Sequence, residues 1–281
     1  MSKTTKDETA VTVTETQLPT IPHDYGEFAG QGTDDFSQRE RGVPFLKILQ
    51  AQSPEVVGPQ GKVEGARPGM LINTSTQQLY DSIKIVPAAR LHVIQEWRPR
   101  NQGGGLVAQT EVEPGRDYPQ FYKEAMARQE ADGRKFGDFW TGEPKKSNEL
   151  QECYQLFSVV LDADDKPIGM IVVPFASSAI SVYTKRFSKR IGQLTGKPPM
   201  FAFPIVLTTE LVSNDEGSWH NYVITFPVEN NPVKSALAPD HPAFLKGAEL
   251  FKLVKGGEVK ADEAGAKSAR GDAGGDGGAA F

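Results

Sequence analysis

Short runs of apolar residues, separated by residues that favour turns, dominate the middle of the chain. The first run covers residues 43–49, and a second short strand is expected at residues 70–72. Residues 83–94 are rich in apolar and β-branched side chains and are interrupted at Pro87. Because proline cannot donate to a strand ladder, this pattern predicts either one long bent strand or an edge strand.

Two β-hairpins are expected further along the chain. Residues 155–161 and 168–173 are apolar and enclose a turn sequence rich in aspartate at residues 162–167. Residues 201–212 and 218–228 form a second pair of this kind around a short polar loop. Apolar strands joined by such loops are typical of antiparallel sheets.

Three segments have the spacing of helices instead. Residues 177–194 form the clearest one, residues 242–253 form a last helix, and residues 119–131 form a short helix. The short helix lies in the polar and aromatic segment 116–150, which we interpret as an insertion. The apolar positions of the first helix recur every three or four residues: Ile180, Tyr183, Phe187, Ile191 and Leu194.

Several antiparallel strands with a helix between two hairpins predict a mainly β (α+β) domain. An oligonucleotide-binding (OB-like) antiparallel β-barrel with one or two helices is the commonest architecture of this content. An α+β sandwich remains an alternative, because strand order cannot be read from the sequence.

Charge and composition set the two ends apart from this domain. The chain has 281 residues and a net charge of −5. Residues 1–43 carry eight acids and four bases, and residues 256–281 carry five acids and three bases. Residues 44–255 therefore have a net charge of +1, so basic patches there can be larger than the overall charge suggests. Both ends are predicted to be disordered, and the last 26 residues contain 15 glycines and alanines.

The same composition excludes several classes of protein. One cysteine rules out a disulfide framework and a four-cysteine zinc module. No apolar run reaches the roughly 18 residues of a membrane span, and the polar N-terminus does not resemble a secretory signal. We therefore expect a cytoplasmic protein without membrane contact. P-loop, dinucleotide-binding, zinc-protease and nucleophile-elbow motifs are absent, so neither an enzyme nor a cofactor is predicted.

Two smaller features have alternative interpretations. Asp162, Asp164 and Asp165 have the chemistry of a divalent-cation site, but aspartate also favours turns because it bonds to its own backbone. We favour the turn. Cys153 precedes a strand and is expected to be a buried, inert thiol.

The strongest chemical signal is a basic helix. Residues 174–209 contain five bases and no acid. Like charges four residues apart disfavour a helix unless an anion offsets them, and a nucleic-acid backbone is such an anion. The alternative is a solvated face whose aromatic residues Tyr183 and Phe187 belong to the core. The bases are Lys185, Arg186, Lys189, Arg190 and Lys197.

A second cluster combines an aromatic residue with guanidinium groups. Trp97, Arg98 and Arg100 precede three consecutive glycines, and Trp140 lies in another segment rich in aromatic residues and lysine. Aromatic faces that stack bases and cations that follow phosphates are typical of single-stranded nucleic-acid binding. The alternative is that Trp97 packs inward. The chain ends in Phe281, which is either a docking residue for a partner protein or an unimportant end.

Several stretches resemble tailed-phage early proteins described as single-stranded DNA-binding proteins. The resemblance implies an OB-type fold and a role in phage replication or recombination. Phe281 is also similar to the terminal residue of the tails of phage and bacterial single-stranded DNA-binding proteins, which implies replication or recombination proteins of phage or host as partners. The stretches are residues 44–50, 53–56, 68–74, 85–87, 96–105, 185–186, 207–209 and 217–219.

The leading hypothesis is a non-enzymatic protein that binds single-stranded DNA with little sequence preference. Trp97, Trp140 and Tyr183 supply aromatic rings, while the arginines and lysines contact phosphates. A virion-associated or protein-interaction module is one alternative, and a metal-dependent nuclease using the Asp162–Asp165 cluster is another. The sequence leaves open whether the protein forms a homo-oligomer.

Overall fold

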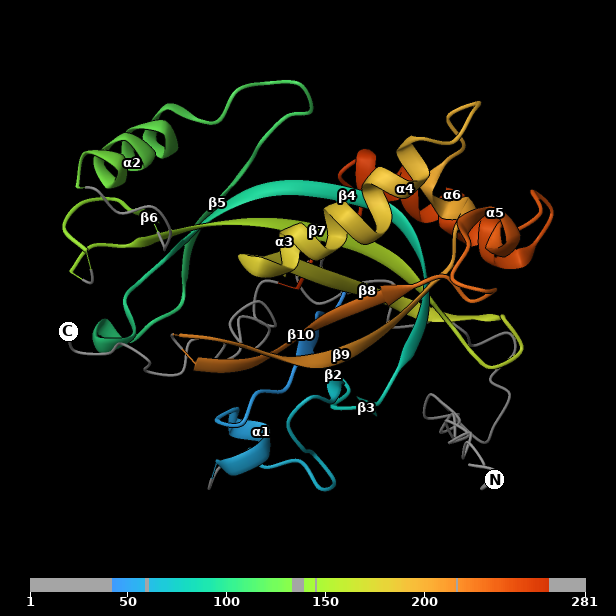
Figure 1. The fold of residues 1–281 in the computed structure, drawn as a ribbon, viewed down its shortest axis with the longest axis horizontal. Coiled ribbons are helices and arrows are strands. Elements are labelled where there is room, and N and C mark those ends of the chain that lie inside the picture. The colour runs from blue at the N-terminus through green and yellow to red at the C-terminus, as the bar shows by residue number, and fades with distance from the viewer. Residues whose placement is uncertain (1–41, 59–60, 133–138, 145, 216, 263–281) are drawn as a thin grey trace, which may run out of the picture.

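The structure is a computed structural model that describes residues 42–262, apart from residues 59–60, 133–138, 145 and 216. It is mainly β, with a seven-stranded and a three-stranded antiparallel sheet and a few helices around them (Figure 1). The predicted mainly β class is therefore confirmed. No helix in this part of the chain is long and apolar enough to cross a membrane.

Two long strands form the centre of the large sheet. β4 (Ile83–Trp97) and β7 (Glu149–Leu161) pair antiparallel over their whole length, with a register shift between Pro87 and Ala89. The shift accommodates Pro87, because a bulge is one of the few places where a strand tolerates proline. The predicted long bent strand is confirmed, but it is central rather than at an edge.

Shorter strands extend the sheet on both sides of this pair. One edge of β4 pairs with β9 (Ile205–Asn214) at residues 83–85 and with β5 (Leu106–Glu111) at residues 93–97. The ladder is therefore split along β4. β9 pairs on its other side with β10 (Gly217–Thr225). The far edge of β7 pairs with β6 (Phe139–Trp140) and β8 (Pro167–Ala176).

The sheets are not closed into a barrel, so the OB-like barrel is not confirmed. β8 and β10 are instead bridged by residues that lead into and out of β1 (Leu46–Ile48). Phe45 makes a single bridge to Val172, and the Gln50 side chain bonds the backbone N–H and C=O of His220 at 2.8 and 2.9 Å. One of these contacts is thus a backbone bridge, and the other is made by a side chain. The small sheet is completed by β2 (Leu71–Asn73) and β3 (Leu79–Tyr80).

Helices cover both faces of the large sheet (Figure 1). One face is covered by a helix in three parts: α3 (Ser178–Tyr183), the π-helical segment Thr184–Ser188 and α4 (Lys189–Gly192). The other face packs against α6 (Pro242–Lys255). The helices predicted at 177–194 and 242–253 are confirmed, although the first contains a π turn. The remaining helices are α1 (Pro54–Val57), α2 (Gln120–Ala131) and α5 (Pro232–Ser235).

The two ends of the described chain lie side by side. Val43 and Ala261 form a parallel bridge, in which the Val43 N–H donates to Lys260 O and the Asp262 N–H donates to Val43 O, both at 2.9 Å. A Cβ on Gly42 would lie 2.7 Å from Asp262 Cα, so this close approach requires glycine. Residues 256–262, which the sequence assigned to a disordered tail, therefore pair with the core. The rest of both predicted tails lies outside the described residues.

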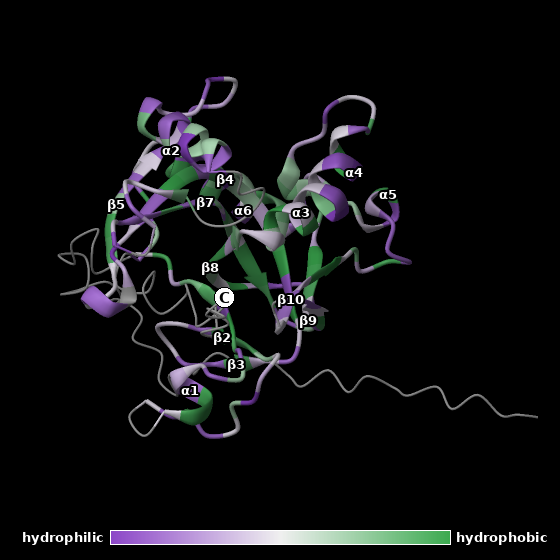
Figure 2. Ribbon diagram, turned by 60° about the vertical axis from the view of Figure 1, so that its left-hand side comes forward, coloured by the Kyte–Doolittle hydropathy of each residue, from purple (hydrophilic) through white to green (hydrophobic). Residues whose placement is uncertain are grey.

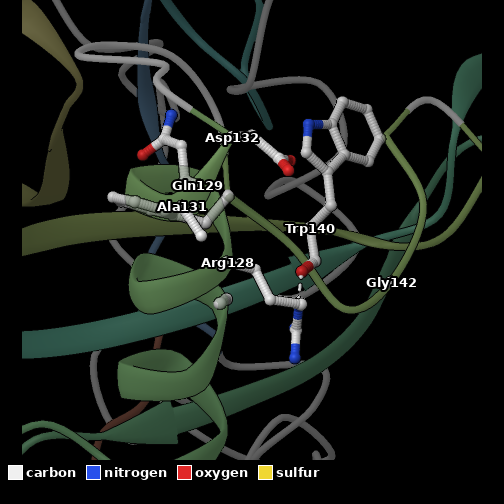
Figure 3. A pocket seen from close by; sticks show the side chains of 8 residues that line it. Arg128, Gln129, Ala131, Asp132, Trp140 and Gly142 are labelled. Carbon is white, nitrogen blue, oxygen red and sulfur yellow. Dashed lines mark hydrogen bonds between the residues drawn. The ribbon is translucent and has the colours of Figure 1, made fainter.

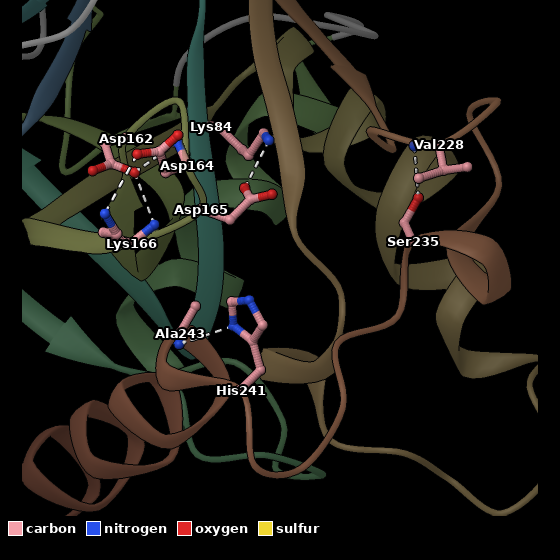
Figure 4. Close-up of polar contacts among 9 residues, drawn as sticks. All are labelled: Lys84, Asp162, Asp164, Asp165, Lys166, Val228, Ser235, His241 and Ala243. Atoms are coloured by element: carbon pink, nitrogen blue, oxygen red, sulfur yellow. Dashed lines mark hydrogen bonds and ion pairs between the residues drawn. The ribbon is translucent and has the colours of Figure 1, made fainter.

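The aspartate-rich turn between β7 and β8 has a structural explanation. Asp162 Oδ1 accepts hydrogen bonds from the backbone N–H groups of Asp164 and Lys166, at 2.9 and 2.8 Å. Asp165 Oδ1 pairs with Lys84 Nζ at 2.7 Å (Figure 4). Within the described residues, no group of histidine, cysteine or acidic side chains is arranged to hold a metal ion. The two hydrogen bonds that Asp162 accepts from its own turn support the turn interpretation.

Candidate nucleic-acid interface

The helix formed by α3, the π turn and α4 has an apolar inner side and a basic outer side. Tyr183 and Phe187 are 2% and 0% exposed and pack in the core on this face of the sheet. Lys185, Arg186 and Lys189 are exposed. The hydropathy colouring shows the same division, with a strongly hydrophilic α4 above hydrophobic strands (Figure 2).

The three exposed bases have no compensating acid. In the part of the chain that the structure describes, the side chains of Lys185, Arg186 and Lys189 form no hydrogen bond or ion pair. Lys185 and Lys189 are four residues apart, so their mutual repulsion costs the helix a few tenths of a kcal/mol. This face of the helix is therefore available to an external anion.

Arg190 and Lys197 differ from these three bases. Arg190 Nη1 donates to Asn230 Oδ1 at 3.0 Å, and its guanidinium lies 4.8 Å from the centre of the Phe226 ring. Arg190 thus fastens the helix to the segment after β10. Lys197 is exposed in the turn that follows the helix.

The predicted cluster after β4 is divided between core and surface. Trp97 is 2% exposed and packs in the core on the α6 side of the sheet, so it offers no face to a base. The alternative that Trp97 packs inward is the one observed, and Tyr183 is likewise buried. Arg98 is exposed, and its backbone N–H donates to Gly105 O at 2.9 Å. Arg100 opens a short 3-10 turn, and its side chain lies outside the described part of the structure.

Trp140 lies beside a hollow of about 160 Å³ between β6 and α2. Arg128 Nη2 donates to the carbonyl oxygens of Trp140 and Thr141, at 3.0 and 3.2 Å, and so ties α2 to β6. Figure 3 shows the indole next to the side chain of Asp132. Trp140 is only half-buried, so its ring remains accessible to a ligand. Phe281, the predicted docking residue, lies outside the described residues.

Sequence reasoning missed a row of aromatic rings between these two regions. His92 on β4 lies 4.8 Å from Tyr154 on β7 and 5.8 Å from Tyr118, measured between ring centres. The row continues from Tyr154 to Tyr183 at 5.8 Å and from Tyr118 towards Tyr122 at 5.1 Å. Its central members, His92, Tyr118 and Tyr154, are partly exposed. The row thus connects the basic helix with the region of α2 and β6.

An ionised carboxylate organises the centre of the row. Glu152 Oε1 lies 2.7 Å from His92 Nε2 and accepts the Tyr118 hydroxyl at 2.8 Å. Burial opposes ionisation of Glu152, but the hydrogen bonds from His92 and Tyr118 outweigh it and lower the pKa of the carboxyl. Burial and the neighbouring Glu152 charge raise the pKa of Tyr118. Glu152 therefore remains charged and holds both rings in place.

The signal for this row was present in the strands. Arg90 and His92, and likewise Glu152 and Tyr154, are polar or aromatic residues two positions apart in otherwise apolar strands. Alternate strand residues share one face, so each pair points to the same side. The register pairs His92 with Tyr154, which only the structure reveals.

The chain matches a family of known proteins. The model of the Pam3 phage gp34-like protein family matches residues 13–260, which is most of the sequence. The chain belongs to this family. The family name supports the bacteriophage origin that the resemblance of the sequence implied. No curated protein and no solved structure matches the chain.

Proposed function

We propose that this gp34-like protein binds single-stranded DNA with little sequence preference and acts without catalysis in phage replication or recombination. The observation that carries the proposal is the uncompensated basic face of Lys185, Arg186 and Lys189, next to a row of partly exposed rings. Cations that follow phosphates and rings that stack bases are the two components of such binding. An open sheet face can supply both, so the proposal does not require a closed OB barrel.

The components have separate roles in this proposal. The three exposed helix bases, together with Lys197, Arg98 and Arg100, contact phosphates. Trp140 stacks a base, and stacking on an accessible ring contributes about 1–3 kcal/mol per base. Trp97, Tyr183 and Arg190 keep the folded domain intact and do not contact the strand.

The ends of the chain have a further role in the proposal. Their acidic residues would limit nonspecific binding, and Phe281 would dock replication or recombination proteins of phage or host. These contacts would take place in the cytoplasm of the host cell.

The experiment is a titration of the whole protein against a fluorescent single-stranded oligonucleotide and its duplex at two salt concentrations. We expect tighter binding of the single strand and a steep loss of affinity with salt. The combined variant K185A/R186A/K189A should lose about tenfold or more in affinity at low salt. Its salt slope should fall by about 2, since each lost phosphate contact removes about 0.7.

A matched variant controls for net charge. Lys62, Lys246 and Lys252 are exposed bases outside the basic helix, and K62A/K246A/K252A removes the same charge. It should bind the single strand within about twofold of the unaltered protein. Equal losses in the two variants would contradict the basic face as the binding site. No binding by the unaltered protein would refute the function, and capture of partners from phage-infected cells would then test the protein-interaction alternative.

A further inference from the structure

A cavity of about 260 Å³ opens where the strand ladder along β4 is split. β9 pairs with β4 up to Ile85, and β5 pairs with β4 from Val93 onward. The edge of β4 between these two residues therefore pairs with neither strand. The cavity is lined by Arg90 and His92 of β4, by residues 111–118 and by Lys255 at the end of α6. It borders the aromatic row but contains none of the exposed bases of the helix.

Two of the three cations of the cavity are available to a ligand. Arg116 Nε is paired with Glu113 Oε2 at 2.9 Å. Lys255 forms no ion pair within the described residues. The Arg90 guanidinium lies 4.8 Å from the centre of the Tyr154 ring, which orients it without neutralising its charge. Arg90 and Lys255 are therefore the lining cations that no acid neutralises within the described residues.

The acids of the cavity can be sorted in the same way. Glu113 is occupied by Arg116, and Asp117 Oδ2 is paired with Lys123 Nζ at 2.9 Å. The pKa of Asp117 is lowered by this lysine. Glu111 at the end of β5 has no ion pair or side-chain hydrogen bond within the described residues, so it is the lining acid that remains open as an acceptor.

Two rings complete the lining. Tyr118 and His92 are both fixed by Glu152, and their planes meet at 84°. Ring orientation is thus determined before a ligand enters. A phosphate-binding pair of cations, an aromatic wall and an open carboxylate match the parts of a single nucleotide.

We propose that this cavity holds one nucleotide of the bound strand. Arg90 and Lys255 contact its phosphate, its base lies against Tyr118 and His92, and Glu111 accepts a hydrogen bond from an exocyclic amino group. A carboxylate pairs well with the amino group of cytosine, whereas thymine has no amino group to offer. The site therefore favours cytosine over thymine at one position. This inference rests on the proposed function, because it assigns the nucleotide to a bound strand.

The test uses free deoxycytidine monophosphate (dCMP), deoxythymidine monophosphate (dTMP) and inorganic phosphate. Binding to the whole protein is followed by calorimetry, in parallel with the oligonucleotide titration. We expect dCMP to bind about fivefold tighter than dTMP, the contribution of one modest contact to a base edge. Inorganic phosphate should bind more weakly than either nucleotide.

Matched variants assign the contacts. Glu111→Gln should bring the dCMP and dTMP affinities together, whereas Glu130→Gln on the exposed side of α2 should leave their ratio unchanged. Lys255→Ala should weaken both nucleotides about three- to tenfold, whereas Lys252→Ala, one turn earlier on α6, should weaken neither. Thermal unfolding of each variant shows that the fold is retained.

The outcomes separate the two proposals. Single-stranded DNA binding without dCMP binding would overturn the nucleotide site and leave the proposed function intact. Equal binding of phosphate and dCMP, or a preference that survives Glu111→Gln, would also overturn the site. Binding of dCMP by a protein that does not bind DNA would overturn the proposed function and the assignment of the nucleotide to a strand.

Discussion

The helices on the two faces of the large sheet place their charges in different ways. α6 carries Lys246 paired with Glu249 at 2.9 Å, and Lys252 and Lys255 lie in its last turn. Cations near a helix C-terminus are stabilised by the helix dipole. The helix of α3 and α4 has no acid, and Lys185 and Arg186 lie in its middle.

This difference shows that the charges of α6 stabilise their own helix, whereas the charges of the α3–α4 helix do not. Each basic residue named on α6 is stabilised locally, either by an ion pair or by the helix dipole. The exposed bases of the α3–α4 helix have no such stabilising partner within the described chain, and their mutual repulsion opposes the helix. Its stability must therefore come from the buried side, which the first prediction tests.

The largest effect is expected from the inner side of the α3–α4 helix. Phe187 is fully buried, and its ring centre lies 5.7 Å from that of Tyr183. Phe187→Ala should lower the free energy of unfolding by about 3–5 kcal/mol in urea denaturation. Phe251 on α6 is 39% exposed, and Phe251→Ala should cost about 1 kcal/mol. Similar losses would show that the two helices depend on buried contacts to the same degree.

A second contrast concerns one glycine in each helix. A Cβ on Gly247 in α6 would lie 2.7 Å from Phe201 Cβ, whereas one on Gly192 in α4 would meet nothing within 4 Å. Gly247→Ala should therefore destabilise the protein by about 1–3 kcal/mol although alanine favours helices. Gly192→Ala should stabilise it by about 0.4–1 kcal/mol. Thermal unfolding measures both, and a stable Gly247→Ala variant would contradict the close packing of α6 on the sheet.

The elements that the sequence predicted well are those with local signals. The helix at 242–253, the turn at Asp162 and the bend at Pro87 all follow from spacing or from turn chemistry. The contact that links the chain after β1 to β10 could not be predicted, because Gln50 and His220 lie 170 residues apart in the sequence. The contact of Arg190 with Asn230 could not be predicted for the same reason, since the two residues lie 40 positions apart.

The candidate site was predicted in part for a related reason. Charge can be read from composition, so the basic helix was found. Burial cannot be read in this way, and Trp97 and Tyr183 are in the core. The row of rings remained hidden because it requires the register of β4 on β7, which places His92 opposite Tyr154.

The third prediction concerns pH and belongs to the face that carries the row of rings. The pKa of Glu152 is lowered in the folded protein, so its contribution to stability is complete above the unfolded value of about 4.3. That contribution is lost as the pH falls through the lower folded value. The Glu152→Gln variant should therefore be less stable than the unaltered protein at neutral pH. Acidification should lower its free energy of unfolding by less than that of the unaltered protein. Urea denaturation at pH 7 and pH 3 compares them, and parallel pH curves would contradict this role.

The smallest effect tests the charges of the two helices directly. Lys185→Gln with Lys189→Gln removes a like-charge pair and should stabilise the protein by about 0.2–0.5 kcal/mol. Lys246→Gln removes the pair with Glu249 and should destabilise it by a similar amount. Both changes should shrink at high salt, because these charges are exposed and screened. Precise denaturant midpoints at two salt concentrations measure them. If the double variant were less stable than the unaltered protein, the lysines would have a stabilising partner within the folded chain, and their availability to DNA would be in question.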